Sequence, residues 1–224
     1  MIFYANKYTK LYLAIILLSF CFYSFKSELK EEWKLKKHEN GIFVYTRMAE
    51  NSKFKELKCV VQLKSSLSGL VALINDRESY PHWVYRCGES TILKKISDTE
   101  IIHRQTVVAP WPVDSRDFVV NVKLHQDTKT KVITIQSKCI PNYIPHKSNF
   151  IRITEFKALW ILSPLSNGMV NVEYQLLVNP GGNVPAWLVN LAVIDGPYET
   201  TLNMKEWIKK EKYQNNHLPY ILEP

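Results

Sequence analysis

Residues 168–194 decide the fold; they read GMVNVEYQLLVNPGGNVPAWLVNLAVI. In the first eleven residues apolar and polar side chains alternate, as in a strand with one buried face. A turn-forming cluster with one proline and two glycines follows at 179–183. Apolar residues then recur near the helical period of 3.6. They are Trp187, Leu188, Leu191, Ile194, Tyr198, Leu202 and Ile208. The segment predicts a half-buried strand and a long amphipathic helix, bent or locally broken at Gly196-Pro197.

The chain before this segment is rich in strand patterns. Six candidate strands follow Trp83, at 84–95, 99–109, 117–127, 130–140, 150–163 and 168–179. Short polar turns separate them, which favours antiparallel neighbours. Before Trp83 we expect a charged helix over 28–38, two strands, a helix capped by Ser66, and a short helix or turn at Tyr80.

This order of elements predicts an α+β fold. A long antiparallel meander curves, and one amphipathic helix cannot fill its concave face completely. We therefore expect a curved antiparallel sheet around the long C-terminal helix, with an internal apolar cavity between them.

The N-terminus predicts an exported protein. Lys7 and Lys10 precede an apolar run over 11–25, which is the pattern of a secretory signal. The run is short for a spanning helix of about 20 residues, although a retained anchor is the alternative. We expect a signal peptide or N-terminal membrane anchor over 1–27, one domain over 28–210 and a polar, frayed tail over 211–224. The style of the leader indicates a bacterial periplasm.

Composition and motifs argue against an enzyme or a nucleic-acid-binding protein. The net charge of +8 falls to +5 without the three lysines of the leader, and no basic helix stands out. Phosphate-loop, dinucleotide-binding, nucleophile-elbow and zinc-protease motifs are absent from the sequence. Cys59, Cys87 and Cys139 lack metal-binding spacing. Two of them could form a disulfide in an oxidising compartment; otherwise they are small buried hydrophobes. We expect no cofactor.

A second unusual stretch, PWPVDSRDFV, covers residues 110–119. Two prolines stiffen a loop around Trp111, and Arg116-Asp117 opens the strand that follows. In one interpretation Arg116 and Asp117 tie the loop to nearby backbone and carboxylates. In the other, Trp111 lies at a cavity mouth and contacts lipid or membrane.

These two stretches together resemble the START (steroidogenic acute regulatory protein-related lipid transfer) domain family, in particular its phosphatidylcholine-transfer branch. The resemblance rests on PWPVDSRDFV and on NPGGNVPAWLVN, which begins about 60 residues after it. GIFVYTR at 41–47 and the aromatic-rich segment from Tyr80 to Trp83 are also similar to the family pattern.

The resemblance implies a helix-grip fold that holds one lipid in an internal cavity. The C-terminal helix, starting near Pro185, and the loop at 110–115 would form the lid. The implied partners are a lipid or other hydrophobic small molecule and, transiently, a membrane surface, with the protein a monomer. The expected ligand-binding residues are Trp83, Trp111, Arg116, Asp117, Tyr174, Trp187, Leu191 and Tyr198.

The ligand itself stays open at this level. The arginine and aspartate of the phosphatidylcholine-type pattern correspond to Tyr80 and Val84, and the arginine of the sterol-type pattern falls near Val122. A fatty acid, isoprenoid or polyketide-like ligand fits equally well. The alternative function is a cyclase, aromatase or hydrolase on the same scaffold. Its few ionisable candidates, Arg104, Glu155, Glu173 and Tyr174, are expected mostly to face solvent.

Overall fold

The computed structural model describes residues 32–224, apart from Pro112 and residues 187, 188, 191 and 192. The predicted leader and two of the predicted ligand-binding residues, Trp187 and Leu191, lie outside this part of the chain. No helix within it is long and apolar enough to span a membrane.

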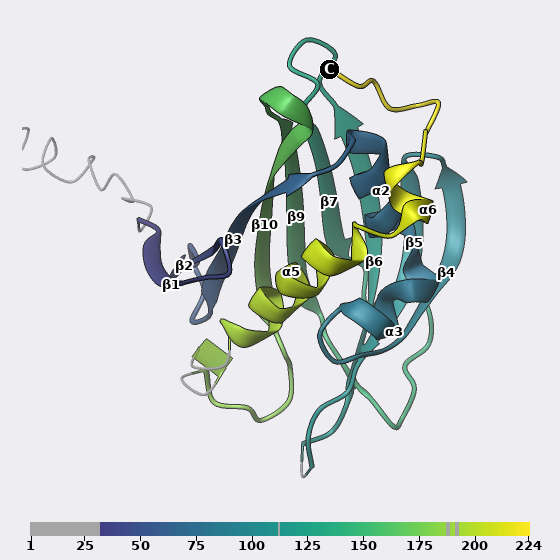
Figure 1. The fold of residues 1–224 in the computed structure, drawn as a ribbon. Helices are drawn as coiled ribbons and strands as arrows, with labels where there is room; N and C mark the ends of the chain where they lie inside the picture. Colours follow the sequence, from purple (N-terminus) through teal and green to yellow (C-terminus); the bar gives the residue numbers. More distant parts are fainter. Residues whose placement is uncertain (1–31, 112, 187–188, 191–192) are drawn as a thin grey trace, which may run out of the picture. The chain divides into compact units, whose positions relative to one another are not determined.

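One large, curved antiparallel sheet dominates the fold (Figure 1). Its strands are β1 Lys34–Glu39, β2 Ile42–Met48, β3 Lys55–Lys64, β4 Cys87–Ser97, β5 Glu100–Val107, β6 Arg116–Gln126, β7 Ile133–Cys139, β8 Ile151–Arg152, β9 Glu155–Pro164 and β10 Met169–Asn179. They lie in the order β1-β2-β3-β10-β9-β7-β6-β5-β4, while the short β8 pairs parallel to β6. The predicted meander is confirmed, with β9 and β10 following β7 in the sheet.

The helices gather on one face of this sheet (Figure 1). They are α2 Leu67–Asn75, the 3-10 turn η1 Arg77–Ser79, α3 Tyr80–Trp83, α5 Asp195–Trp207 and α6 Glu211–Gln214; a second 3-10 turn, η2 Ser166–Gly168, joins β9 to β10. α5 runs across the sheet and contacts β2, β3 and α3. The predicted α+β helix-grip fold is confirmed.

The core lies between the helices and the sheet. Leu57, Cys59, Val61 and Leu63 alternate on β3 and are all buried, as their spacing predicts. They join one apolar cluster that includes α2 and the α5 residue Met204. Cys59, Cys87 and Cys139 are free thiols. Burial raises the pKa of Cys59 to about 12, so this thiol is unreactive at neutral pH.

One local prediction is wrong, and another is right in kind but not in position. Residues 34–39 form β1 instead of part of a helix, because pairing with β2 outweighs their helix preference. The predicted local break in the C-terminal helix is present but lies just before Gly196-Pro197: residues 193 and 194 form a turn and α5 begins at Asp195. Pro197 therefore lies in the first turn of α5, where its missing N–H costs no hydrogen bond.

The C-terminal tail is ordered, contrary to the predicted frayed end. It forms α6, and the side chains of Tyr213 and Ile221 are buried. The Glu223 carboxylate accepts hydrogen bonds from the backbone N–H groups of Leu67 (2.9 Å) and Ser68 (2.8 Å). A carboxylate at the start of α2 satisfies two free donors and complements the helix dipole. The tail thus caps α2 from the far end of the chain.

Candidate functional site

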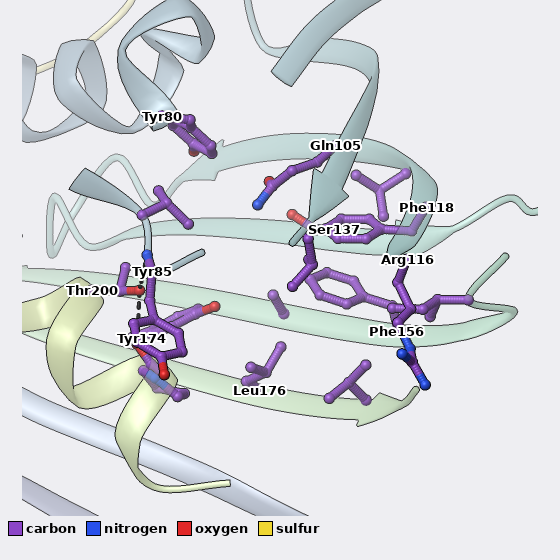
Figure 2. Close-up of a pocket in the computed structure, with 18 of the residues that line it drawn as sticks. Tyr80, Tyr85, Gln105, Arg116, Phe118, Ser137, Phe156, Tyr174, Leu176 and Thr200 are labelled. Atoms are coloured by element: carbon purple, nitrogen blue, oxygen red, sulfur yellow. Dashed lines mark hydrogen bonds between the residues drawn. The ribbon is translucent and has the colours of Figure 1, made fainter. Parts of the chain in front are cut away.

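A cavity of about 260 Å³ lies between the concave side of the sheet and the helices α3 and α5 (Figure 2). Its lining is mainly apolar and strongly aromatic. The aromatic residues in it are Tyr80, Trp83, Tyr85, Phe118, Phe156, Trp160 and Tyr174. A concave apolar pocket with a few polar groups is the usual form of a small-molecule site.

Short side chains in the sheet leave room for this cavity. Ser137 on β7 pairs with Ala158 on β9, and Ala158 in turn pairs with Leu176 on β10. All three line the cavity. Protein interiors are normally close-packed. Because Ser137 and Ala158 have short side chains where larger ones could fill the core, a hollow is left beside them.

Stacked aromatic pairs form a firm wall beside this row. The rings of Trp160 and Tyr174 stack with centroids 3.9 Å apart, and those of Phe118 and Phe156 with centroids 4.4 Å apart. Burial raises the pKa of Tyr174, so its hydroxyl stays protonated. The wall offers apolar surface and one neutral hydroxyl to a ligand.

Polar side chains gather at one end of the cavity. Arg77, His103 and Gln105 line it and are at most 7 % exposed. The Tyr80 hydroxyl donates to the carbonyl of Ile74 (2.6 Å) and accepts from the Arg77 guanidinium. Burial and the nearby Arg77 charge hold the pKa of His103 well below its ordinary value, so the imidazole is neutral.

Arg116 lies well away from Tyr80 in the lining, as Figure 2 shows. Its guanidinium donates to the carbonyls of Asp114 and of Pro180, the latter at 3.4 Å. Gly182 has a φ of +65°, and a Cβ there would lie 3.0 Å from Ile151. This turn therefore needs glycine. The two stretches singled out in the sequence thus meet in space, joined by Arg116.

The loop between β5 and β6 carries exposed apolar side chains. Trp111 is 93 % exposed, and Val108 and Val113 are also exposed. A cluster of this kind on a loop is a candidate for contact with another apolar surface. Trp111 does not line the cavity itself.

The other predicted ligand-binding residues divide into two groups. Trp83, Arg116 and Tyr174 line the cavity. Tyr198 is buried but does not line it; its hydroxyl accepts from the Asn40 side chain (2.8 Å), and the Lys37 ammonium lies 3.7 Å from its ring centroid. These contacts connect α5 to β1 and to the turn that follows β1.

Asp117 is fully buried in an ion cluster outside the cavity. Its carboxylate accepts from Arg104 Nε (2.9 Å) and from Arg152 Nε (2.7 Å) and Nη2 (3.0 Å). Burial alone would raise the pKa of Asp117, but the bonds and charges of Arg152 and Arg104 outweigh it and lower the pKa. The tying interpretation of Arg116-Asp117 therefore holds. Of the ionisable candidates expected mostly to face solvent, Arg104 is buried and Tyr174 lines the cavity.

Sequence reasoning missed the polar end of the cavity. His103 and Gln105 alternate with Arg104 on β5, so a period of two could have placed them on the inner face. Arg77 lies in the polar segment between α2 and α3 and carries no periodic signal. No cluster of three or more possible metal-ligating side chains occurs among the residues that the structure describes.

Comparison with known proteins now identifies the family. The START domain model matches residues 24–209. The chain belongs to the START domain family. It is 32 % identical over 182 residues to the Pseudomonas aeruginosa protein PA1579, covering 81 % of this chain and 89 % of that protein. It is 25 % identical over 170 residues to rat phosphatidylcholine transfer protein, covering 74 % and 78 %.

A solved START structure shares the fold. It is a fragment of the STAR-related lipid transfer protein from Xanthomonas axonopodis, with a TM-score of 0.74 and 32 % identity. The match covers 80 % of this chain and 99 % of that one. The predicted START resemblance is therefore confirmed.

Asp117→Asn tests the ion cluster. The change keeps the size of the side chain but leaves the buried Arg152 without a counter-charge and Arg104 with Glu89 alone, at 3.3 Å. We therefore expect the free energy of unfolding in urea to fall by about 3–5 kcal/mol. Because folding lowers the pKa of Asp117, this stabilisation is present above the unfolded pKa of about 4 and is lost as pH falls through the lower folded value.

Glu56→Gln is the matched control, because Glu56 pairs with Arg47 in a partly exposed bridge. We expect this variant to lose about 1 kcal/mol or less. Equal losses in the two variants would contradict the special role of the buried cluster.

Proposed function

We propose that this chain, as a monomer, binds one hydrophobic ligand in its cavity and carries it between membranes without altering it. The aromatic cavity inside a START domain carries the proposal. Moving lipid chain from water into such a cavity contributes about 0.8 kcal/mol per CH₂ group, so the cavity can compete with a bilayer. The names of the rat and Xanthomonas relatives, both lipid transfer proteins, support the same function.

Ligand entry needs a gate, and α5 is the proposed one. Gly196, Pro197 and Thr200 of α5 line the cavity. The Tyr85 backbone N–H donates to the Thr200 hydroxyl at 3.1 Å, the dashed line in Figure 2. The Asn203 side chain of α5 also donates to the Trp83 carbonyl at 3.0 Å. Tilting of α5 away from α3 would break these two bonds and open the cavity. At about 260 Å³ the cavity is near the lower end for ligand pockets, which supports a widening step for a larger lipid.

The positions of the ionisable candidate residues favour a lipid carrier over an enzyme. Arg104 is held in the Asp117 cluster, Glu155 accepts from Asn179, and Glu173 accepts from Gln175. None of the three lines the cavity. Tyr174 does, but as a neutral phenol. A cyclase, aromatase or hydrolase would need a reactive group among the remaining lining residues.

Native mass spectrometry tests ligand binding. Mature protein purified from cells without detergent should carry one lipid per chain. Ala158→Phe fills the cavity from its floor and should lower the bound fraction about tenfold, equivalent to 1.4 kcal/mol. Lys157→Phe is the matched control, because Lys157 is exposed on the opposite face of β9. An empty wild-type protein that also takes up no lipid from mixed liposomes would refute the proposal.

The Trp111 loop is the proposed membrane contact. An indole ring is suited to the membrane interface, and removing it from an inserted loop should cost about 1.5 kcal/mol. We therefore expect Trp111→Ala to slow vesicle-to-vesicle lipid transfer about tenfold. Leu165→Ala is the control, since Leu165 is 40 % exposed beside η2, at the opposite end of the sheet in Figure 1. An unchanged rate would remove Trp111 from the mechanism.

Export is proposed from the leader. In a Gram-negative host, we expect the mature chain in the periplasmic fraction with an N-terminus just after Ser24 or Ser27. Peptide mass mapping would identify that terminus. Full-length chain in the membrane fraction would instead indicate the retained anchor, and full-length chain in the cytoplasm would contradict export.

A further inference from the structure

Arg77 is a buried charge without a counter-ion. The residue is 5 % exposed, and its guanidinium lines the cavity. Among the described residues, its one hydrogen-bond partner is the Tyr80 hydroxyl, its Nε has none, and no carboxylate forms a salt bridge with it. A buried guanidinium without a paired charge costs several kcal/mol, so this arrangement needs a physical reason.

The acids next to Arg77 in the sequence are not available to it. The Asp76 carboxylate accepts from the Lys212 ammonium and from the Tyr213 hydroxyl, both at 2.8 Å. Those bonds lower the pKa of Asp76 although burial opposes them. Glu78, one residue further on, is exposed to solvent. The fold thus directs the nearby negative charges outward and leaves the positive charge facing the cavity.

The groups around Arg77 are also incompletely satisfied. His103 is 3 % exposed, and neither of its ring nitrogens makes a well-formed hydrogen bond within the described chain, although the Gln105 side chain lies near enough to interact with it. Its ring stands edge to face against Tyr80, with centroids 6.4 Å apart. Gln105 follows on the same face of β5 and also lines the cavity. Unsatisfied buried donors of this kind are rare in folded proteins and point to a missing partner.

We propose that this polar end, consisting of Arg77, His103 and Gln105, binds the anionic head group of the ligand, a carboxylate or a phosphate. The inference rests on the proposed function, and it specifies the chemical class of the lipid. The planar guanidinium fork suits either anion, and the head group supplies the charge that the protein lacks. The hydrocarbon chain would lie along the aromatic pairs of the wall and over the short row of Ser137 and Ala158.

The second arginine in the cavity lining, Arg116, has acceptors within the fold. Arg116 also lines the cavity, but backbone carbonyls of Asp114 and Pro180 accept from its guanidinium. Its bonds connect two loops of the fold, whereas within the described part of the chain Arg77 bonds only to the Tyr80 hydroxyl. The anion is therefore assigned to Arg77.

A three-ligand competition tests the assignment. Delipidated full-length mature protein is mixed with equal amounts of oleate, oleyl phosphate and oleyl alcohol, which share one chain and differ only in the head group. Native mass spectrometry reports the bound species. A charge-assisted hydrogen bond contributes about 1.5–3 kcal/mol, so one or both anions should exceed the alcohol about 10- to 100-fold. The preferred anion then distinguishes a fatty acid from a phospholipid-type head group.

Variants assign the preference to the residue. Arg77→Met should reduce the anion-to-alcohol ratio to near one while the alcohol still binds, and Arg77→Lys should keep part of the preference. Arg86→Gln is the matched control, because it removes an exposed arginine that does not line the cavity and should leave the ratio unchanged. The wild-type mixture alone remains decisive if Arg77→Met fails to fold.

The outcomes separate the two proposals. Equal loading of all three ligands would overturn the anion assignment and leave lipid binding intact. A preference that persists in Arg77→Met would overturn the role of Arg77. Failure to load any of the three, or any lipid from liposomes, would instead refute the proposed function.

Discussion

The pairing of β10 between β3 and β9 is the constraint on which the rest of the structure depends. It joins the N-terminal strands to the end of the meander, with continuous register from Met169 to Leu176 against β3 and from Val170 to Asn179 against β9. Without it the sheet would be two separate pieces, each with an open edge. Because α5 is the next long element after β10, the same pairing determines where in the sheet the chain leaves for this helix.

The cavity is a consequence of how that face is filled. α5 and α2 pack on β3 and its neighbours through a continuous apolar cluster, whereas the row of Ser137, Ala158 and Leu176 lines the cavity. Filling such a hollow with larger residues is a common way to stabilise a protein. The open cavity therefore makes this protein less stable than a filled one would be. The cluster around Asp117 and the cap at Glu223 lie outside the cavity and stabilise the frame around it.

The alternation on β3 and the apolar spacing after Ser66 predicted buried faces that the structure has, because those patterns reflect local burial. The failures have non-local causes. β1 is a strand only because β2 lies beside it, and the tail is ordered because one carboxylate, Glu223, reaches the start of α2 from 155 residues away. The polar end of the cavity was missed for a similar reason. In the sequence, Arg77 has the pattern of an exposed residue in a polar segment between two helices. Only the structure shows that the carboxylate of its neighbour Asp76 is hydrogen-bonded to Lys212 and Tyr213.

The two arginines in the cavity show why burial alone does not identify a ligand-binding group. Both are charged, at least nine-tenths buried and without a carboxylate partner among the described residues. Arg116 nevertheless has backbone acceptors in two loops, so its charge is partly compensated by carbonyl dipoles, and its contacts explain its burial within the fold itself. Among the described residues, Arg77 has one hydroxyl acceptor, which donates its own proton to the Ile74 carbonyl, and the nearby His103 imidazole makes no well-formed hydrogen bond. Contacts within the folded chain therefore explain the burial of Arg116 but not that of Arg77. A buried charge whose hydrogen-bonding groups lack partners is what distinguishes a ligand-binding residue from a structural one.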